Sequence, residues 1–325
     1  MLTTLLKLMS DGRFHSGEAL GAKLGVSRAA VWKALRPLEQ KGFPIQRVRG
    51  KGYRIPVGAV LLEEEVILNH LPADCRNFWS WHLYQDVDST NAEAQRLMSE
   101  FGRRRLVCVS EQQSAGRGRR GRAWVSPYAQ NIYLSVTEPF DTGAQGLEGL
   151  SLVVGIVLAE TLQDCGYDGV ELKWPNDILL DGKKLAGILI EIAGDLTSDC
   201  VVVIGVGINV LMREESGGPI EQAWTSLLQS SPQGELDRNK LVALFTAKLL
   251  KAIEIFRHSG FEPFVPGWQQ LDAWFGHMVN VVSGSHVISG RHCGVTERGA
   301  LKLETDDGLV LANGGEVSLR KQDAS

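Results

Sequence analysis

The sequence predicts an α+β protein of three domains, and three features of the chain indicate this fold. Residues 1–62 contain a basic pair of helices and a hairpin, residues 63–273 alternate apolar strands with helices, and residues 274–325 contain mainly short strands. Strands mixed with helices, followed by a separate run of strands, are typical of a mixed-sheet α/β body with a small β-domain attached. We therefore place the domain boundaries after residues 62 and 273.

The composition is that of an ordinary globular protein, with 325 residues, 44% hydrophobic residues and a net charge of −4. The charge is unevenly spread, because residues 1–55 carry eleven Lys and Arg against three Asp and Glu. This segment is therefore at about +8 and the remainder of the chain at about −12. We expect only the first domain to meet a polyanion.

The five cysteines are scattered and never form a C-x-x-C pair, so the sequence predicts neither a disulfide framework nor a zinc site. No apolar run reaches the length of a membrane span. We expect a cytoplasmic protein without a membrane partner.

The basic N-terminal segment predicts a helix-turn-helix. Leu20 and Leu24 lie one turn apart on a first helix, and Ser27 can cap a second helix that Gly42 ends. Pro37 removes a backbone donor inside the second helix and should kink or shorten it.

Residues 45–55 then alternate apolar and basic side chains around Gly50-Lys51-Gly52, the pattern of a β-hairpin wing. A winged helix binds DNA with its second helix in the major groove and with cations on the backbone phosphates. The residues expected there are Ser27, Arg28 and Lys33 in the groove, and Arg47, Arg49, Lys51 and Arg54 on phosphates. A protein-interaction module is the alternative.

A strand over residues 81–87 leads to Asp88-Ser89-Thr90-Asn91, at the start of a helix. Thr90 and Glu93 would form a capping box there. The exposed hydroxyl and amide groups of the same quartet could instead bind a polar ring.

After a second strand over residues 106–111, residues 116–122 contain four arginines and three glycines. Glycines let backbone N–H groups approach an anion, and guanidinium groups match phosphate and carboxylate oxygens. The string also fits G-x-G-x-x-G, but a Rossmann fingerprint needs a helix at its last glycine, and here the chain runs extended to Pro127. We predict an anion-binding loop; a solvated basic surface loop is the alternative.

The remaining body has a strand over residues 131–136, a buried helix over 150–162, and a hairpin that turns at Asp181-Gly182. Lys184 enters the sheet beside Gly187, where missing side-chain bulk leaves room for a ligand. A buried strand over 201–210 carries Asn209. The sequence has no P-loop and no nucleophile set, so the chemistry must occur between bound ligands, with cations stabilising phosphate charge.

A helix over residues 237–258 precedes the last domain, in which five short strands are expected over 279–282, 286–289, 300–305, 309–312 and 317–320. This pattern fits a small antiparallel SH3-like barrel.

Five segments resemble, in order, the motifs of biotin protein ligases. They are Ser89-Thr90-Asn91, Gly116 to Gly121, Lys173-Trp174-Pro175-Asn176-Asp177, Lys184 to Ile188, and Gly205 to Asn209. With the winged helix in front, residues 5–320 resemble the bifunctional bacterial biotin ligases that also repress the biotin operon.

The resemblance implies a biotin/lipoate ligase-like central domain and a C-terminal SH3-like β-barrel. It also implies a two-step reaction, in which biotin and ATP with Mg²⁺ form biotinyl-5′-AMP, and the biotinyl group then passes to a lysine of the biotin carboxyl carrier protein of acetyl-CoA carboxylase. The adenylate would act as corepressor, with operator DNA and a homodimer of the adenylate-bound chain as partners.

The site residues that the resemblance implies fall into three groups. Lys184, Arg119 and Asp177 would be catalytic, although Asp177 could equally be a buried structural acid. Biotin would contact Ser89, Thr90, Asn91, Gln113, Gly116, Arg117, Gly118, Arg119, Lys184 and Gly187. The nucleotide would contact Arg119, Arg120, Arg122, Trp124, Lys173, Asn176 and Asn209, with Trp124 stacked on adenine, and the metal would come with ATP.

Two alternatives stay open. The first is an adenylate-sensing transcriptional repressor without efficient ligase activity. The second is a relative of lipoate ligases, against which the arginine loop and the winged helix argue.

Overall fold

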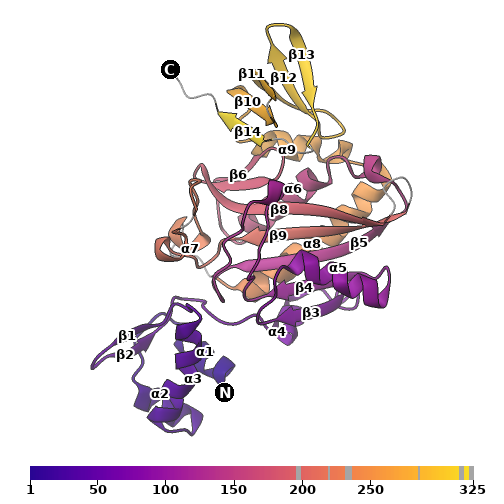
Figure 1. Cartoon of the computed structure of the whole chain (residues 1–325). Helices are drawn as coiled ribbons and strands as arrows, with labels where there is room; N and C mark the ends of the chain where they lie inside the picture. Colours follow the sequence, from indigo (N-terminus) through magenta and orange to yellow (C-terminus); the bar gives the residue numbers. More distant parts are fainter. Residues whose placement is uncertain (195–198, 219, 231–235, 285, 315–317, 322–325) are drawn as a thin grey trace.

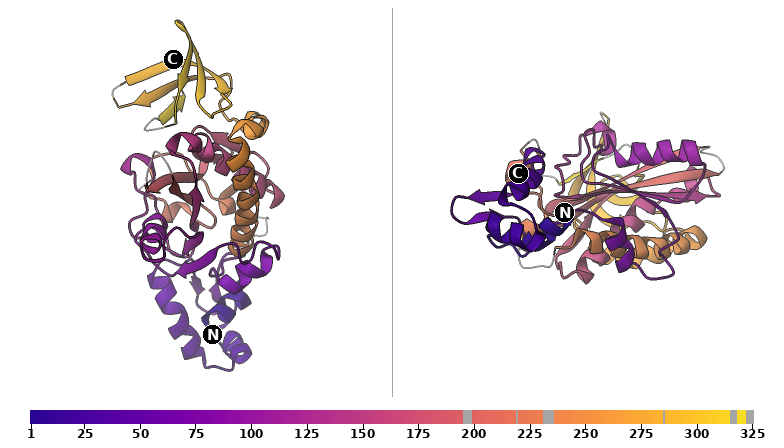
Figure 2. Two further views of the ribbon diagram at one scale, coloured as in Figure 1. Left: turned by 90° about the vertical axis from the view of Figure 1, so that its right-hand side faces the viewer. Right: turned by 90° about the horizontal axis from the view of Figure 1, so that it is seen from below.

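The computed structural model describes residues 1–194, 199–218, 220–230, 236–284, 286–314 and 318–321. The chain forms three units that follow one another from the N-terminus at one end of the molecule to a C-terminal sheet at the other (Figures 1 and 2). A large mixed sheet with its helices occupies the middle.

The N-terminal unit is a winged helix-turn-helix, as predicted. Ser16 and Ser27 each accept a hydrogen bond from the backbone N–H three residues later, so hydroxyl groups cap the second and third helices. Leu20 and Val31 bury their side chains between the helices. The elements are α1 (Leu2–Met9), α2 (Gly17–Leu24), α3 (Arg28–Gln40), β1 (Gln46–Val48) and β2 (Gly52–Arg54).

Pro37 does not shorten α3, which continues to Gln40, so the expected shortening was wrong. A proline inside a helix costs about 3 kcal/mol. The same helix buries Val31, Leu35 and Leu38, each worth about 1.5–3 kcal/mol. Burial of this apolar face therefore outweighs the lost hydrogen bond.

The central unit contains a seven-stranded sheet in the order β3-β4-β5-β9-β8-β7-β6. Only the β3–β4 pair is parallel, so the sheet is mixed, as predicted. Its strands are β3 (Ser80–Tyr84), β4 (Leu106–Ser110), β5 (Ile132–Phe140), β6 (Val170–Lys173), β7 (Asp177–Leu180), β8 (Lys183–Gly194) and β9 (Cys200–Ile208).

Helices cover both faces of this sheet (Figure 2). α5 packs on β4, β5 and β9, whereas α6 packs on β6, β7 and β8 and also contacts α8. The helices are α4 (Glu64–His70), α5 (Thr90–Phe101), α6 (Leu150–Asp164), α7 (Leu227–Ser230), α8 (Arg238–Ser259) and α9 (Val265–Leu271). Short 3₁₀ turns are η1 (Arg119–Gly121), η2 (Ala144–Leu147), η3 (Glu214–Ser216) and η4 (Glu262–Phe264).

The segment Gln145–Asp164, which includes most of η2 and all of α6, is long and apolar enough to cross a membrane, but 67% of its apolar window is buried inside the protein. Its position between the sheet and α8 is that of a core helix.

The C-terminal unit is a five-stranded antiparallel sheet in the order β13-β12-β11-β10-β14, which fits the predicted SH3-like class. Among the described residues its edge strands β13 and β14 are not paired with each other. The strands are β10 (Met278–Ser283), β11 (His286–Val295), β12 (Leu301–Thr305), β13 (Gly308–Ala312) and β14 (Ser318–Lys321). Val317, expected to begin the last strand, lies outside the described residues.

The second of these strands is longer than the sequence predicted. β11 runs on to Val295 because it continues to pair with β12 there. Gly290 and His292 are buried in this part of the strand, and His292 contacts Asp272 at 2.7 Å. That contact joins the C-terminal sheet to the end of the central domain.

Candidate active site

The start of α5 is held by a residue from a distant loop. Thr90 donates to the side-chain oxygen Oε1 of Gln113 from both its backbone nitrogen, at 2.9 Å, and its hydroxyl, at 3.2 Å. The expected capping box between Thr90 and Glu93 was wrong, because Ser89 is the N-cap residue and its side chain accepts no cap bond. Glu93 instead pairs with Arg96 at 2.6 Å. A tertiary contact therefore satisfies the helix end.

Ser89, Thr90 and Asn91 are all buried on the sheet. The hydroxyl oxygen of Ser135 on β5 lies 2.7 Å from Oγ1 of Thr90 and 2.6 Å from Oδ1 of Asn91. The Asn91 amide donates to a carboxylate oxygen of Glu191 at 2.8 Å. Asn91 is thus bound within the protein, while sequence reasoning missed Ser135 and Glu191. The only signal was a polar residue within an apolar strand.

The arginine loop folds back on itself as a narrow hairpin. Gly118 N–H donates to the Arg122 carbonyl at 2.7 Å, and Trp124 N–H donates to the Gly116 carbonyl at 2.9 Å. No α-helix opens at Gly121, in agreement with the rejection of a Rossmann site. A Cβ on Gly116 would lie 2.7 Å from the Trp124 carbonyl oxygen, so this position has no room for a side chain.

Two arginines of the loop reach other parts of the chain. Arg119 donates to Oδ1 of Asn176 at 2.9 Å and to the carbonyl of Gly314 in the C-terminal domain at 2.7 Å. Arg117 lies 3.4 Å from a carboxylate oxygen of Glu191. Arg120, which has a left-handed backbone with φ of 58°, and Arg122 have exposed side chains. The loop therefore spans the junction between the two domains.

Trp124 lies on a floor made by two glycines of neighbouring strands. Gly187 of β8 pairs with Gly207 of β9. A Cβ on Gly207 would lie 2.5 Å from Cε2 of the indole, and one on Gly187 would lie 3.1 Å from Cζ3. The indole nitrogen is buried and has no hydrogen-bond partner among the described residues. The glycines therefore serve first to seat Trp124.

Three charged side chains meet beside this floor. Nζ of Lys184 lies 2.6 Å from one oxygen of Asp177, and Nζ of Lys173 lies 3.8 Å from the other. Burial lowers the pKa of Lys173; the negative charge of Asp177 opposes this shift, and the positive charges of Lys184, Arg122 and Arg320 add to it. Two ammonium groups facing one carboxylate leave an excess of positive charge, which suits an anionic ligand.

The other two residues expected to bind the nucleotide, Asn176 and Asn209, already use their side-chain amides in hydrogen bonds within the protein. Asn176 donates to the Ile188 carbonyl at 2.9 Å, which leaves its oxygen for Arg119. Asn209 is buried and donates to the Thr225 carbonyl at 3.1 Å. Its amide is therefore used in holding the segment after β9.

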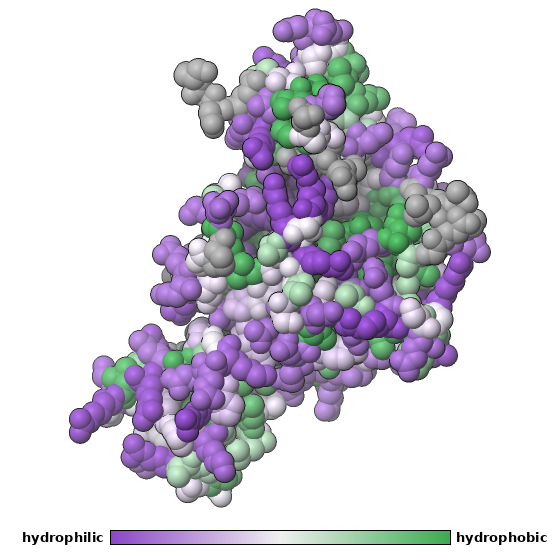
Figure 3. All heavy atoms as spheres, viewed as in Figure 1, coloured by the Kyte–Doolittle hydropathy of each residue, from purple (hydrophilic) through white to green (hydrophobic). Residues whose placement is uncertain are grey.

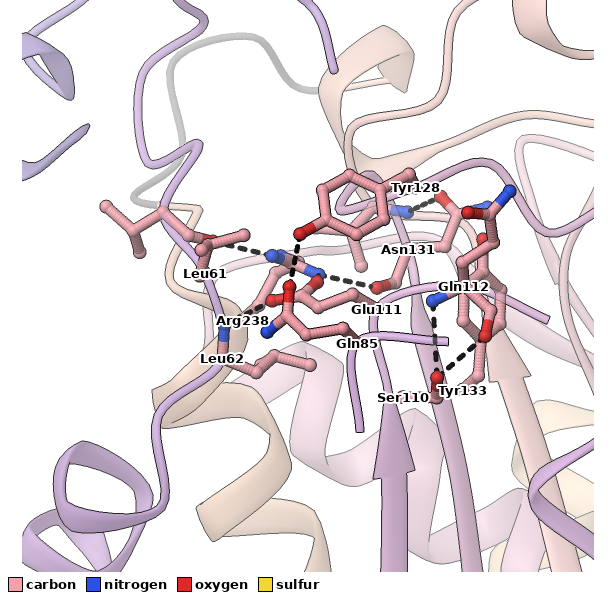
Figure 4. Close-up of polar contacts among 12 residues, drawn as sticks. Leu61, Leu62, Gln85, Ser110, Glu111, Gln112, Tyr128, Asn131, Tyr133 and Arg238 are labelled. Atoms are coloured by element: carbon pink, nitrogen blue, oxygen red, sulfur yellow. Dashed lines mark hydrogen bonds and ion pairs between the residues drawn. The ribbon is translucent and has the colours of Figure 1, made fainter. Parts of the chain in front are cut away.

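A buried ion pair ties the interdomain linker to the loop that carries Gln113 (Figure 4). Arg238, at the start of α8, lies 2.7 Å from Glu111, and neither side chain is more than 1% exposed. Glu111 accepts from Leu62 N–H at 2.5 Å, and Arg238 donates to the carbonyls of Val60 at 2.6 Å and Asn131 at 2.9 Å. Sequence reasoning missed this clamp, whose partners are far apart along the chain.

The predicted DNA-binding side chains lie at one end of the molecule. Ser27, Arg28 and Lys33 on α3, and Arg47, Arg49, Lys51 and Arg54 on the wing, are exposed or half-buried. Arg28 pairs with Glu18 at 3.0 Å, and both side chains are open to solvent. The cations therefore remain accessible to a polyanion.

Comparisons with known proteins match each unit separately. The family described as "HTH domain" matches residues 2–54, "Biotin/lipoate A/B protein ligase family" matches 83–209, and "Biotin protein ligase C terminal domain" matches 275–320.

Relatives that match nearly the whole chain are consistent with these three domain matches. "Bifunctional ligase/repressor BirA" of Salmonella typhimurium is 42% identical, over 98% of this chain and 97% of the relative. The protein of that name from Escherichia coli K12 is 40% identical, over 97% and 96%. Among solved structures, a biotin protein ligase from Aquifex aeolicus in complex with biotin and ATP is 27% identical with a TM-score of 0.64, over 75% of this chain and 99% of that one. The chain therefore belongs to the family of bifunctional biotin ligase/repressors.

Proposed function

We propose that this chain activates biotin with ATP to form biotinyl-5′-AMP and transfers the biotinyl group to a lysine of the biotin carboxyl carrier protein of acetyl-CoA carboxylase. The observation that carries the proposal is the excess of positive charge around Asp177, next to the glycine floor under Trp124. An ATP-dependent acyl activation needs such a site, because a carboxylate must approach a polyphosphate of the same sign.

In the first step a biotin carboxylate oxygen attacks the α-phosphorus of ATP and pyrophosphate leaves. Lys184, Lys173, Arg119 and Arg122 would balance the negative charge that builds up on the phosphate. Mg²⁺ would enter the site bound to ATP, as part of the MgATP substrate. Arg120, Asn176 and Asn209 would complete the nucleotide site, with Trp124 against adenine.

Biotin would lie along β5 and β8. Ser89, Thr90, Asn91 and Gln113 would surround its polar ring, while Gly116, Arg117 and Gly118 would contribute backbone groups and Gly187 would give it space. Because Gln113 already accepts from Thr90, it presents its amide side to Ser126 and the site.

In the second step the carrier lysine attacks the biotinyl carbonyl and AMP leaves. The attacking amine must lose a proton, and Asp177 is the nearby carboxylate that we assign to polarise it. Its contact with Lys184 would orient it toward the amine. Residues 116–122 would cover the adenylate and shield it from water.

The test is transfer of labelled biotin, with ATP, to a carrier domain. Lys184→Ala should lower the rate by about a hundredfold or more, because it removes a preorganised charge. Lys183→Ala is a matched control, since Lys183 is the exposed neighbour on the same strand. Equal rates for the two variants would contradict the assignment. A parent chain that binds the adenylate but leaves the carrier unlabelled would favour the sensor alternative.

We further propose that the first domain represses transcription by binding operator DNA, with biotinyl-5′-AMP as corepressor and a homodimer as the active form. The edge of β8 supports the dimer, because among the described residues Leu189 to Gly194 pair with β9 on one side only. Such an edge can pair with a strand of another chain. Biotin plus ATP should therefore tighten both self-association and operator binding. Sedimentation and gel-shift measurements that are unchanged by the two ligands would refute this coupling.

We also infer a cytoplasmic location without membrane contact, because all five cysteines are unpaired thiols. The domain boundaries after residues 62 and 273 remain part of the proposal.

A further inference from the structure

Trp32 on α3 is exposed to solvent and lies outside the face of the helix that packs on the core. All eight tryptophans lie in the described part of the chain, and Trp32 is the only one with an exposed side chain, at 38%. The core side of α3 is formed by Val31, Leu35 and Leu38, and Trp32 is absent from the side chains packed on that core. The exposed indole does not contribute the free energy of burial to the fold. It would contribute that free energy on binding, when another surface covers it.

The surroundings of Trp32 indicate what would cover it. Arg36 places its guanidinium 5.1 Å from the centre of the indole ring, and Lys33 is exposed beside it. The wing adds further cations, and the domain surface seen in Figure 3 is largely hydrophilic. Cations therefore surround one exposed apolar ring. A binding partner complementary to this arrangement carries negative charge at its rim and an apolar group further inside.

The major groove of DNA has that character. Phosphates line its rim, and the 5-methyl group of thymine is the apolar group that bases display in it. Ala29, which is also exposed on α3, is small enough to let the helix approach the bases closely. A residue one turn further along a recognition helix faces the same groove.

We propose that Trp32 is a specificity-determining residue that packs against thymine methyl groups in the operator, with Arg36 holding the ring in place. This inference rests on the proposed DNA binding and deepens it, since it names the base feature that is read. The cations of α3 and the wing would supply affinity, whereas Trp32 would discriminate between sequences.

The experiment uses the full chain with biotin and ATP. A duplex is first selected from a random pool by the parent protein. Each thymine of the selected half-site is then replaced by uracil, which removes only the methyl group, and affinities are measured for the parent and for Trp32→Ala. Phe101→Ala is the matched control, because Phe101 is an exposed aromatic residue on a helix of the central domain.

For the parent we expect about a fourfold loss of affinity at one or two of the uracil positions, which corresponds to one methyl group. Trp32→Ala should bind the selected duplex at least about tenfold more weakly, lose sensitivity to uracil at those positions, and keep the parent's salt dependence, because no phosphate contact is removed. Trp32→Phe should recover part of the loss, and Phe101→Ala should behave as the parent.

The outcomes separate two failures. If the parent selects no duplex, the proposed DNA binding fails. If it selects one but Trp32→Ala keeps the parent's uracil sensitivity, the role of Trp32 is overturned while DNA binding stands. If Trp32→Ala instead weakens self-association without DNA, the ring serves contact between two copies and the inference is likewise overturned.

Discussion

The buried pair between Arg238 and Glu111 allows a quantitative prediction. Arg238→Met fills a similar volume but removes the guanidinium that faces Glu111 at 2.7 Å and the carbonyls of Val60 and Asn131. The Glu111 carboxylate would then be left with the N–H of Leu62 as its remaining hydrogen-bond donor among those identified. Removing one partner of a buried ion pair costs about 3–5 kcal/mol, because the other charge stays buried without compensation.

Thermal unfolding followed by tryptophan fluorescence measures this cost. For a domain of the size of residues 63–273, each kcal/mol lowers the Tm by roughly 2–4 °C, so we expect a decrease of roughly 6–20 °C. Arg298→Met is the control, since Arg298 pairs with Glu148 at 3.1 Å with side chains 70% and 41% exposed. Exposed pairs contribute less than about 1 kcal/mol.

A double-mutant cycle identifies the cause. Glu111→Gln removes the charge that Arg238→Met would strand, so the double variant should lose less stability than the sum of the single variants. Additive losses, or a Tm for Arg238→Met within about 2 °C of the Arg298→Met control, would refute the clamp.

Two further predictions concern the site, and a third concerns a cysteine buried in the core. Gly207→Ala places a Cβ 2.5 Å from the Trp124 indole, so it should displace the ring, lower stability by about 1–3 kcal/mol and reduce biotin transfer. Gly218→Ala is the control, because a Cβ there meets no atom of the described residues within 4 Å. Burial lowers the pKa of Lys173 below its usual 10.5, so its ammonium loses its proton at a lower pH than a free lysine does. The KM for ATP should therefore begin to rise before the pH reaches 10.5, and Lys173→Arg, which stays charged, should abolish that rise. A pH-independent KM would contradict this. Burial raises the pKa of Cys108 to about 12, so in the native protein this thiol should resist alkylation by iodoacetamide at pH 8. Unfolding in urea should make it reactive, which peptide mapping would show. Rapid labelling of Cys108 in the native protein would contradict this prediction.

Local sequence signals predicted much of this protein. Ser27 capping α3, the basic hairpin tip and the apolar strands around Asn209 each depend on residues within a few positions of one another. The five ordered motifs identified the family, because their glycines and cations stand at fixed places along the chain.

The site contacts depended on segments that only folding brings together. Gln113 replaces the expected capping box at Thr90, the glycine pair on β8 and β9 seats Trp124, and Arg238 meets Glu111. No periodicity or turn pattern encodes such pairs, since their partners are separated by 23 residues for Thr90 and Gln113 and by 127 for Glu111 and Arg238. Their geometry follows from strand order and side-chain packing. The sequence by itself determined which elements form and which chemical groups they carry, whereas the tertiary structure decided which of those groups meet, because that depends on how the sheet and its loops close around one another.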